Sequence, residues 1–389
     1  MQFANRTNNV AAFQVMELVQ RAQALQAQGK PVIHLSIGEP DFTAPDAVLR
    51  ALHSATSKGM TQYTAALGIA PLRKAISEYY GDRFNVDVAP SRIIVTAGAS
   101  AALSLASCAL VNPGDRVLMT DPSYPCNRHF VAAFDGLPDA IKVGADTRFQ
   151  MTSDLVTKHW HKDGKNASGV LLATPANPTG TSIPYAELTK IVDQVQSLNG
   201  FSIVDEIYLG LSYDATPRSI LEHTSDVVVT NSFSKFFHMT GWRLGWLVVP
   251  ENAVDTFERL TQNLYICAST LAQHAALACF EKESMAIFDH RAAQFKARRD
   301  YLAPELRRLG FEIPAMPDGA FYFYLDCKNL TDSTSALADR LLNEAYVSLV
   351  PGADFGANEP NRYMRLSYAT EMSQLKEAVA RMQKFFALS

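Results

Sequence analysis

Short apolar runs rich in β-branched residues alternate along the chain with longer stretches in which apolar residues recur every three or four positions. The short runs predict strands at 92–96, 115–120, 169–174, 201–205, 226–231 and 241–249, and helical patterns lie at 100–110 and 185–198. Strands that are apolar on both faces and separated by helices are typical of a mostly parallel sheet with helices on both sides. We therefore predict a large α/β domain over residues 45–275.

A different pattern follows residue 280. It predicts a long amphipathic helix at 285–309, strands at 321–325, 347–350 and 363–367, and a closing helix from residue 371. This order indicates a second, smaller α+β domain over residues 276–389. Residues 1–44 are expected to form an N-terminal segment that packs with this small domain.

Composition narrows the class of protein. The 389 residues include 35 Lys and Arg against 39 Asp and Glu, so no broad basic field exists for nucleic acid or an anionic membrane. The first 20 residues do not resemble a signal peptide, and no apolar stretch is long enough to span a membrane. Five scattered cysteines form no metal-ligand or redox motif. The sequence thus predicts a cytoplasmic protein with reduced thiols.

Polar residues that follow strands carry the most functional weight, because open α/β sheets bind ligands outside the carboxyl ends of their strands. Asp205 ends the run Phe201–Asp205, and a carboxylate at the end of a buried strand needs a partner. That partner is a helix N-terminus or a structural salt bridge in one interpretation. In the other it is a buried cation of a ligand, such as a protonated pyridine ring.

Lys235 follows another strand-like run and stands directly before Phe236 and Phe237. Most lysines are simply solvated, but apolar neighbours lower the pKa of an amine and make it a nucleophile toward carbonyl groups. Ser232 and Ser234 precede Lys235, and Arg243 follows eight residues later. A ligand with both an aldehyde and a phosphate would use all of these groups together.

Three further strings have both an ordinary and a functional interpretation. Gly98, Ala99 and Ser100 form a glycine turn into a helix, which is either a plain turn or an anion site made by backbone N–H groups. Asn177–Gly180 (Asn-Pro-Thr-Gly) is a turn after a strand. Arg365 is a strand arginine that either reaches solvent or pairs with an anionic substrate. No dinucleotide fingerprint, P-loop, HExxH metal motif or GxSxG elbow is present.

Taken in order, these strings resemble the fold-type-I, class I/II aminotransferases, an aspartate aminotransferase-like family of enzymes that use pyridoxal phosphate. The resemblance runs from Leu35–Phe42 (LSIGEPDF) to the strand of Arg365. Its most specific parts are Asn177–Gly180, Asp205–Tyr208 (DEIY) and Ser232–Lys235 (SFSK), the last followed by Gly241-Trp242-Arg243. The family implies a seven-stranded, mostly parallel sheet in the large domain and transfer of an α-amino group from an L-amino acid to a 2-oxo acid, with 2-oxoglutarate as the expected acceptor and a ping-pong mechanism.

The resemblance also implies a role for each motif residue. Lys235 would carry the cofactor as a Schiff base and later move a proton between the substrate α-carbon and the cofactor. Asp205 would keep the pyridine nitrogen protonated, and Arg365 would bind the substrate carboxylate with Gly38 closing over it. The remaining implied cofactor contacts are those of Asn177 and Tyr208 with the phenolic oxygen, Tyr124 with the ring face, and Gly98, Ala99, Ser100, Ser232, Ser234 and Arg243 with the phosphate.

Two positions bear on assembly and substrate. Tyr63 matches the tyrosine that reaches the phosphate of the neighbouring subunit in this family, and Cys267–Gln273 matches a segment that borders the partner's site, so a homodimer is expected. Some aspartate-specific members carry a lysine on the helix after the phosphate turn, but residues 101–111 include no basic residue. Aspartate specificity by that device is not expected. The other basic candidates for a side-chain carboxylate are Arg21, Arg128 and His129.

Two alternatives stay open at this stage. A carbon–sulfur lyase on the same fold would use the same Lys235, Asp205 and Arg365. A transcription regulator that senses the cofactor would need a DNA-binding domain, for which the resemblance, beginning near residue 30, leaves no room. The basic field that DNA binding needs is absent as well.

Overall fold

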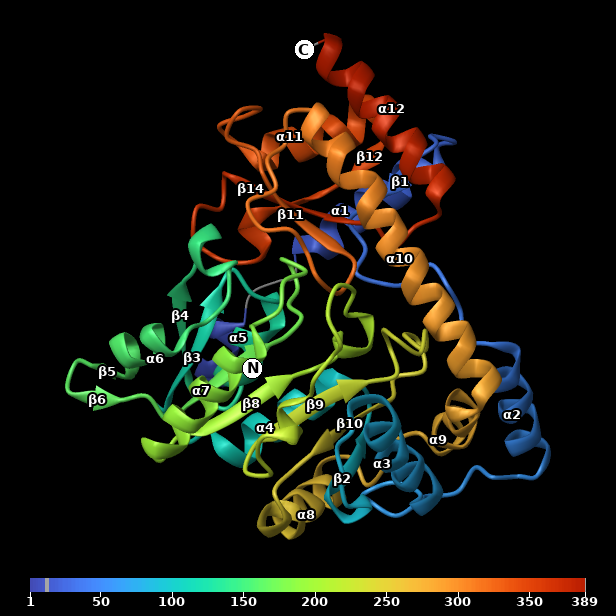
Figure 1. Cartoon of the computed structure of the whole chain (residues 1–389), viewed down its shortest axis with the longest axis vertical. Helices are drawn as coiled ribbons and strands as arrows, with labels where there is room; N and C mark the ends of the chain where they lie inside the picture. Colours follow the sequence, from blue (N-terminus) through green and yellow to red (C-terminus); the bar gives the residue numbers. More distant parts are fainter. Residues whose placement is uncertain (11–13, 389) are drawn as a thin grey trace.

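The computed structural model describes residues 1–10 and 14–388. Residues 11–13, within the expected N-terminal segment, and residue 389 lie outside the described part of the chain. Two sheets organise the molecule. A seven-stranded sheet with its helices forms the large unit, and a three-stranded sheet with its helices forms the small unit (Figure 1).

The large sheet confirms the prediction of a mostly parallel, seven-stranded sheet among helices. β10 is antiparallel to both of its neighbours, and the other pairs are parallel. In spatial order the strands are β2 (Ile93–Thr96), β10 (Gly245–Val248), β9 (Val228–Ser232), β8 (Phe201–Asp205), β7 (Gly169–Ala173), β3 (Arg116–Asp121) and β4 (Leu137–Lys142).

Strand side chains alternate between two apolar layers. Ile203 on β8 packs in a cluster with residues of one set of helices, whereas its neighbour Val204 packs in the cluster on the other face. This alternation explains why the strands read as continuous apolar runs. The first layer includes α4 (Ala99–Leu110), α5 (Pro125–Ala132) and α8 (Val254–Leu264); the second includes α2 (Asp46–Ser57), α3 (Ala70–Phe84), α6 (Ser153–Trp160), α7 (Tyr185–Ser197) and α9 (Thr270–Ala276).

The small unit is an antiparallel sheet covered by helices from the last third of the chain. Its strands lie in the order β11 (Tyr322–Asp326), β14 (Tyr363–Ser367) and β13 (Val350–Pro351). The long helix α10 runs beside both units in Figure 1, and α12 packs against its far end. The helices of this part are α10 (Lys282–Arg308), α11 (Thr334–Arg340) and α12 (Met372–Leu388).

Two parts of the N-terminal segment lie beside the small unit, although they are far from it in sequence, whereas the short helix η1 (Asn5–Asn9) contacts α5 of the large unit (Figure 1). β1 (Ile33–His34) pairs in parallel with β12 (Val347–Ser348). α1 (Gln14–Ala27) buries Val15 and Leu18 in one apolar cluster with Tyr324 of β11.

Two predicted strands differ from the observed ones, and one strand and one hairpin were not predicted. The run 347–350 divides into β12 and β13, which belong to different sheets. The run 241–249 is a strand only at Gly245–Val248, and its first residues form the turn that carries Arg243. β4 was not predicted, because its sequence Leu-Pro-Asp-Ala-Ile-Lys has a proline and mostly solvent-accessible side chains, as an edge strand allows. A short hairpin, β5 (His161–Lys162) with β6 (Lys165–Asn166), was not predicted either.

Candidate active site

A cavity of about 480 Å³ lies where the carboxyl ends of β7 and β8 meet the small unit. Most of the residues singled out from the sequence line it. They are Gly38, Ala99, Ser100, Tyr124, Asn177, Asp205, Tyr208, Ser234, Lys235, Arg243 and Arg365. Three others, Gly98, Ser232 and Tyr63, do not line this cavity, and their places are described below.

Lys235 extends from the loop after β9 toward the N-terminal segment. Its Nζ donates a hydrogen bond to the carbonyl oxygen of Gly38, at 2.5 Å. The side chains of Phe236 and Phe237 are buried behind it. Burial lowers the pKa of the Lys235 amine to about 8, although the carboxylate of Glu39 acts in the opposite direction. About a tenth of the amine is therefore unprotonated and nucleophilic at pH 7, far more than for an ordinary lysine.

Asp205 is the last residue of β8 and is buried. Its Oδ1 accepts hydrogen bonds from the Thr230 hydroxyl at 2.9 Å and from the Ile207 amide at 3.1 Å. Burial raises the pKa of its carboxyl to about 6. The structure contradicts the interpretation of Asp205 as a helix cap or structural salt bridge, because within residues 1–10 and 14–388 no basic side chain forms an ion pair with it and it caps no helix.

An anion site forms where the start of α4 meets Arg243. Gly98 has φ = 83° at the N-cap, and a Cβ there would lie 2.6 Å from the Arg243 guanidinium, so only glycine allows this close approach. The Ser234 hydroxyl lines the same cavity as Arg243 and accepts a hydrogen bond from Ser232 Oγ at 2.9 Å. In the described part of the chain, Arg243 has no carboxylate partner. Helix N–H groups, hydroxyls and a guanidinium without a carboxylate partner together suit a phosphate.

Arg365 points into the molecule, which contradicts the interpretation that its head reaches solvent. Only 3% of the residue is exposed. Its guanidinium donates to Asn177 Oδ1 at 2.8 Å and to the carbonyl oxygen of Ser36 at 2.6 Å, and it lies over the rings of Tyr322 and Phe355. No carboxylate among the described residues neutralises it, and its Nε has no partner. A buried, unpaired guanidinium is a site for a carboxylate of a ligand.

Sequence reasoning missed Tyr322, which lines the cavity. Its hydroxyl is 2.8 Å from that of Tyr208. A Cβ at Gly38 would lie 2.7 Å from the same hydroxyl, so Gly38 packs tightly against it. All five residues of β11 are buried, and a strand without polar alternation gives no signal of which face meets a ligand. Other lining residues that were missed are Val15, Val19, Gln23, Ile37, Glu39, Leu103, Ala173, Ile207 and Thr240.

Four sequence-derived candidates lie elsewhere. Tyr63 is 79% exposed on the outer surface. Arg21 pairs with Asp339 at the surface. Arg128 donates to the carbonyl oxygen of Asp354, and neither it nor the neighbouring His129 lines the cavity. No group of residues in the described chain has the composition of a metal site, and none of its helices could span a membrane.

Comparison with known proteins shows which family of proteins the chain is similar to. The family model described as aminotransferase class I and II matches residues 30–382. A valine–pyruvate aminotransferase of Mycobacterium tuberculosis is 36% identical, with 96% of this chain and 95% of that protein aligned, and an aspartate aminotransferase of Thermotoga maritima is 32% identical, with 98% of each aligned. The crystal structure of an aminotransferase from Mycobacterium tuberculosis superposes with a TM-score of 0.95 at 36% identity, covering 100% of both chains.

Proposed function

The chain belongs to the class I and II aminotransferases, which depend on pyridoxal phosphate, and from this premise we propose that it moves the α-amino group of an uncharged L-amino acid to a 2-oxo acid by a ping-pong mechanism. One observation carries the proposal: an amine, a carboxylate without a cationic partner and a guanidinium without an anionic partner converge in one cavity at Lys235, Asp205 and Arg365.

The residues present fit the cofactor. Bound pyridoxal phosphate supplies an aldehyde that condenses with amines and a protonated ring that accepts electrons. In this proposal Lys235 holds the aldehyde carbon, and the buried Asp205 keeps the proton on the ring nitrogen. The other residues proposed to hold it are Tyr124 against the ring, Asn177 and Tyr208 at its phenolic oxygen, and Gly98, Ala99, Ser100, Ser232, Ser234 and Arg243 at the phosphate.

The chain's own groups then orient the substrate and move its proton. Arg365 and the backbone of Gly38 hold the α-carboxylate of the amino acid. Lys235, once free, takes the proton from the α-carbon, and its lowered pKa of about 8 lets it act as a base and then as an acid. The described part of the cavity holds one unpaired guanidinium for an α-carboxylate, so donor and acceptor must use it in turn, which supports the ping-pong order.

The cavity favours donors with neutral side chains. Its basic groups are the three already used, Lys235, Arg243 and Arg365, and the remaining lining from α1 is Val15, Val19 and Gln23. A relative that covers most of the chain is a valine–pyruvate aminotransferase. We propose 2-oxoglutarate as the amino-group acceptor, with the Gln23 amide donating a hydrogen bond to its second carboxylate. Pyruvate is the acceptor for comparison.

We further propose that the chain works as a cytoplasmic homodimer in which Tyr63 reaches the phosphate of the neighbouring subunit. The loop of Tyr63 lies against the segment 267–273, since Thr270 Oγ1 donates to Gln62 O at 2.7 Å. Exposed apolar side chains lie in this loop, Met60 and Tyr63, and just before the segment 267–273, Leu264 and Ile266. The division into residues 1–44, 45–275 and 276–389 belongs to the same proposal.

Transamination and its alternative, carbon–sulfur lysis, give different results with a single substrate. A transaminase given one good amino acid and no oxo acid should release one equivalent of oxo acid and leave the cofactor aminated, whereas a lyase would turn over repeatedly and release ammonia or thiol. Measurement of product per active site separates the two. Borohydride reduction followed by peptide mapping should place the cofactor on Lys235, and an adduct on another lysine would contradict the proposal.

A further inference from the structure

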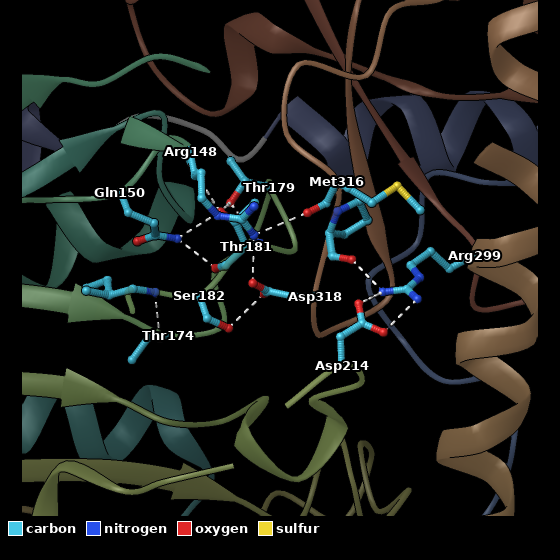
Figure 2. A network of polar contacts seen from close by, with 12 residues as sticks. Arg148, Gln150, Thr174, Thr179, Thr181, Ser182, Asp214, Arg299, Met316 and Asp318 are labelled. Atoms are coloured by element: carbon cyan, nitrogen blue, oxygen red, sulfur yellow. Dashed lines mark hydrogen bonds and ion pairs between the residues drawn. The ribbon is translucent and has the colours of Figure 1, made fainter. Parts of the chain in front are cut away.

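Asp318 lies in the segment that enters β11, and all its polar groups bond to the large unit. Its amide donates to the carbonyl oxygen of Gly180 at 2.9 Å, and its own carbonyl oxygen accepts from the Tyr213 amide at 2.9 Å. Its carboxylate accepts from the Ser182 hydroxyl at 2.8 Å and from the Arg148 guanidinium at 2.7 Å. Figure 2 shows these two side-chain bonds meeting at Asp318.

Two of the partners of Asp318, Gly180 and Ser182, lie in or just after the turn that carries Asn177. This turn is closed by the Gly180 amide, which donates to Ala176 O at 2.8 Å, and Gly180 itself has φ = 66°. A Cβ at Gly180 would lie 2.6 Å from Pro317 Cβ, so the turn and the Asp318 segment are in direct contact. A shift of Asp318 would therefore shift the turn.

The substrate end of the same turn meets Arg365. Asn177 Oδ1 accepts from the Arg365 guanidinium at 2.8 Å, while Tyr322, four residues after Asp318, lies under that guanidinium with 4.6 Å between its ring centroid and Arg365 Cζ. Two of the groups that contact Arg365, Asn177 and Tyr322, thus extend from the segments joined at Asp318.

We propose that Asp318 is a positioning residue that fixes the guanidinium of Arg365 for the α-carboxylate of the substrate. It acts through Asn177 on one side and Tyr322 on the other, without touching the substrate itself, since it does not line the cavity. The proposal rests on the proposed function, in which Arg365 binds that carboxylate.

The test measures carboxylate binding by the holoenzyme apart from catalysis. The probe is 3-methylbutanoate, which keeps the carboxylate and carbon skeleton of valine but has no amino group to react. We expect Asp318→Ala to raise its Kd roughly 3- to 10-fold, the effect of one misplaced hydrogen bond, as followed by cofactor absorbance. The single-turnover rate at saturating amino acid should change less than the Kd. Asp318→Asn should restore part of the affinity, because the amide oxygen can still accept from Arg148.

A matched control is Asp139→Ala. Asp139 on β4 accepts from Arg116 Nε at 3.2 Å, and neither residue lines the cavity. Its side chain is 14% exposed against 30% for Asp318, so its loss should lower the Tm at least as much. The control should leave the Kd of the probe at the wild-type value. If Asp318→Ala also leaves the Kd there, or if both variants change it equally, Asp318 has only a structural role and the proposal is overturned.

Two outcomes separate this proposal from the function on which it rests. Failure of the wild-type holoenzyme to bind any carboxylate would overturn the Arg365 site itself, and the role of Asp318 with it. A normal wild-type Kd with no effect at Asp318 would overturn the positioning role alone. If Asp318→Ala does not fold, Ser182→Ala and Arg148→Gln each remove one bond to the same carboxylate and should raise the Kd by a smaller factor; wild-type values in both would reject the proposal.

Discussion

Asp205 and Asp326 occupy the same kind of position in two different sheets. Each is the last residue of a buried strand, and the two are 6% and 1% exposed. Asp326 accepts from Arg362 at 2.7 and 3.0 Å, so its charge is neutralised within the chain. Asp205 accepts from neutral donors, and no described basic side chain bonds to it. A buried carboxylate left without a cation indicates a ligand that supplies one, here the protonated ring of the cofactor.

The largest effects are expected from substitution of the two aspartates, one of which should affect catalysis and the other stability. Asp205→Asn should lower kcat about 100- to 1000-fold, because the amide cannot hold a proton on the ring nitrogen in the transition state. Asp326→Asn should instead lower the Tm and leave kcat near the wild-type value, since Arg362 loses one of its two carboxylate partners and neither residue lines the cavity. Steady-state kinetics and thermal unfolding of both holoenzymes test this. Wild-type turnover in Asp205→Asn would remove Asp205 from the chemistry.

The two arginines sharpen the same comparison. Arg365→Lys should raise the KM of every amino acid about 10- to 150-fold, because the planar fork is lost while the charge remains. Arg362→Lys, next to Asp326, should leave the KM unchanged. Kinetics with several donors measure both effects. A KM that changes for some side chains only would mean that Arg365 contacts the side chain rather than the α-carboxylate.

The stability of the cofactor-free protein should fall as the pH rises. Burial raises the pKa of Asp205 to about 6 and that of Glu206 to about 7. Stabilisation from these bound protons is complete below about pH 4 and is lost as the pH passes 7, amounting to about 2–3 kcal/mol per group. The free energy of unfolding, measured with denaturant from pH 5 to 8, should change less with pH in Glu206→Gln than in the wild type. Bound cofactor should reduce the pH dependence that Asp205 contributes to the free energy of unfolding. An equal slope of that free energy against pH in the wild type, in Glu206→Gln and in the holoenzyme would contradict the assignment.

The smallest effect is expected at the surface. Tyr63→Phe should speed cofactor loss about 2- to 10-fold by removing one hydrogen bond across the proposed dimer. Tyr301→Phe on α10 is the control and should not change the rate, which cofactor absorbance after dilution measures. If dissociation to monomers leaves the effect of Tyr63→Phe intact, the tyrosine does not act across an interface.

The sequence predicted the strand ends better than the pairs formed across the cavity. Asp205 and Lys235 follow apolar runs, and parallel strands bring their carboxyl ends to one edge, so local pattern and topology together place them. The bond between Asn177 and Arg365 joins residues 188 positions apart, and it depends on how the two sheets pack. Tyr322 was not predicted for the same reason. The division of residues 347–350 between two sheets depends on pairing with β1, which is distant in sequence.

The pairing of β1 with β12 has a consequence for protein synthesis. Ile33 pairs with Val347, which leaves the ribosome more than 300 residues later. At about 5–20 residues per second, the first strand of the nascent chain waits roughly 15–60 s for its partner. The large sheet has all of its strands by Val248 and can form in that interval, whereas the wall of the cavity built from Ile37 and Gly38 cannot be fixed until Val347 has been synthesised.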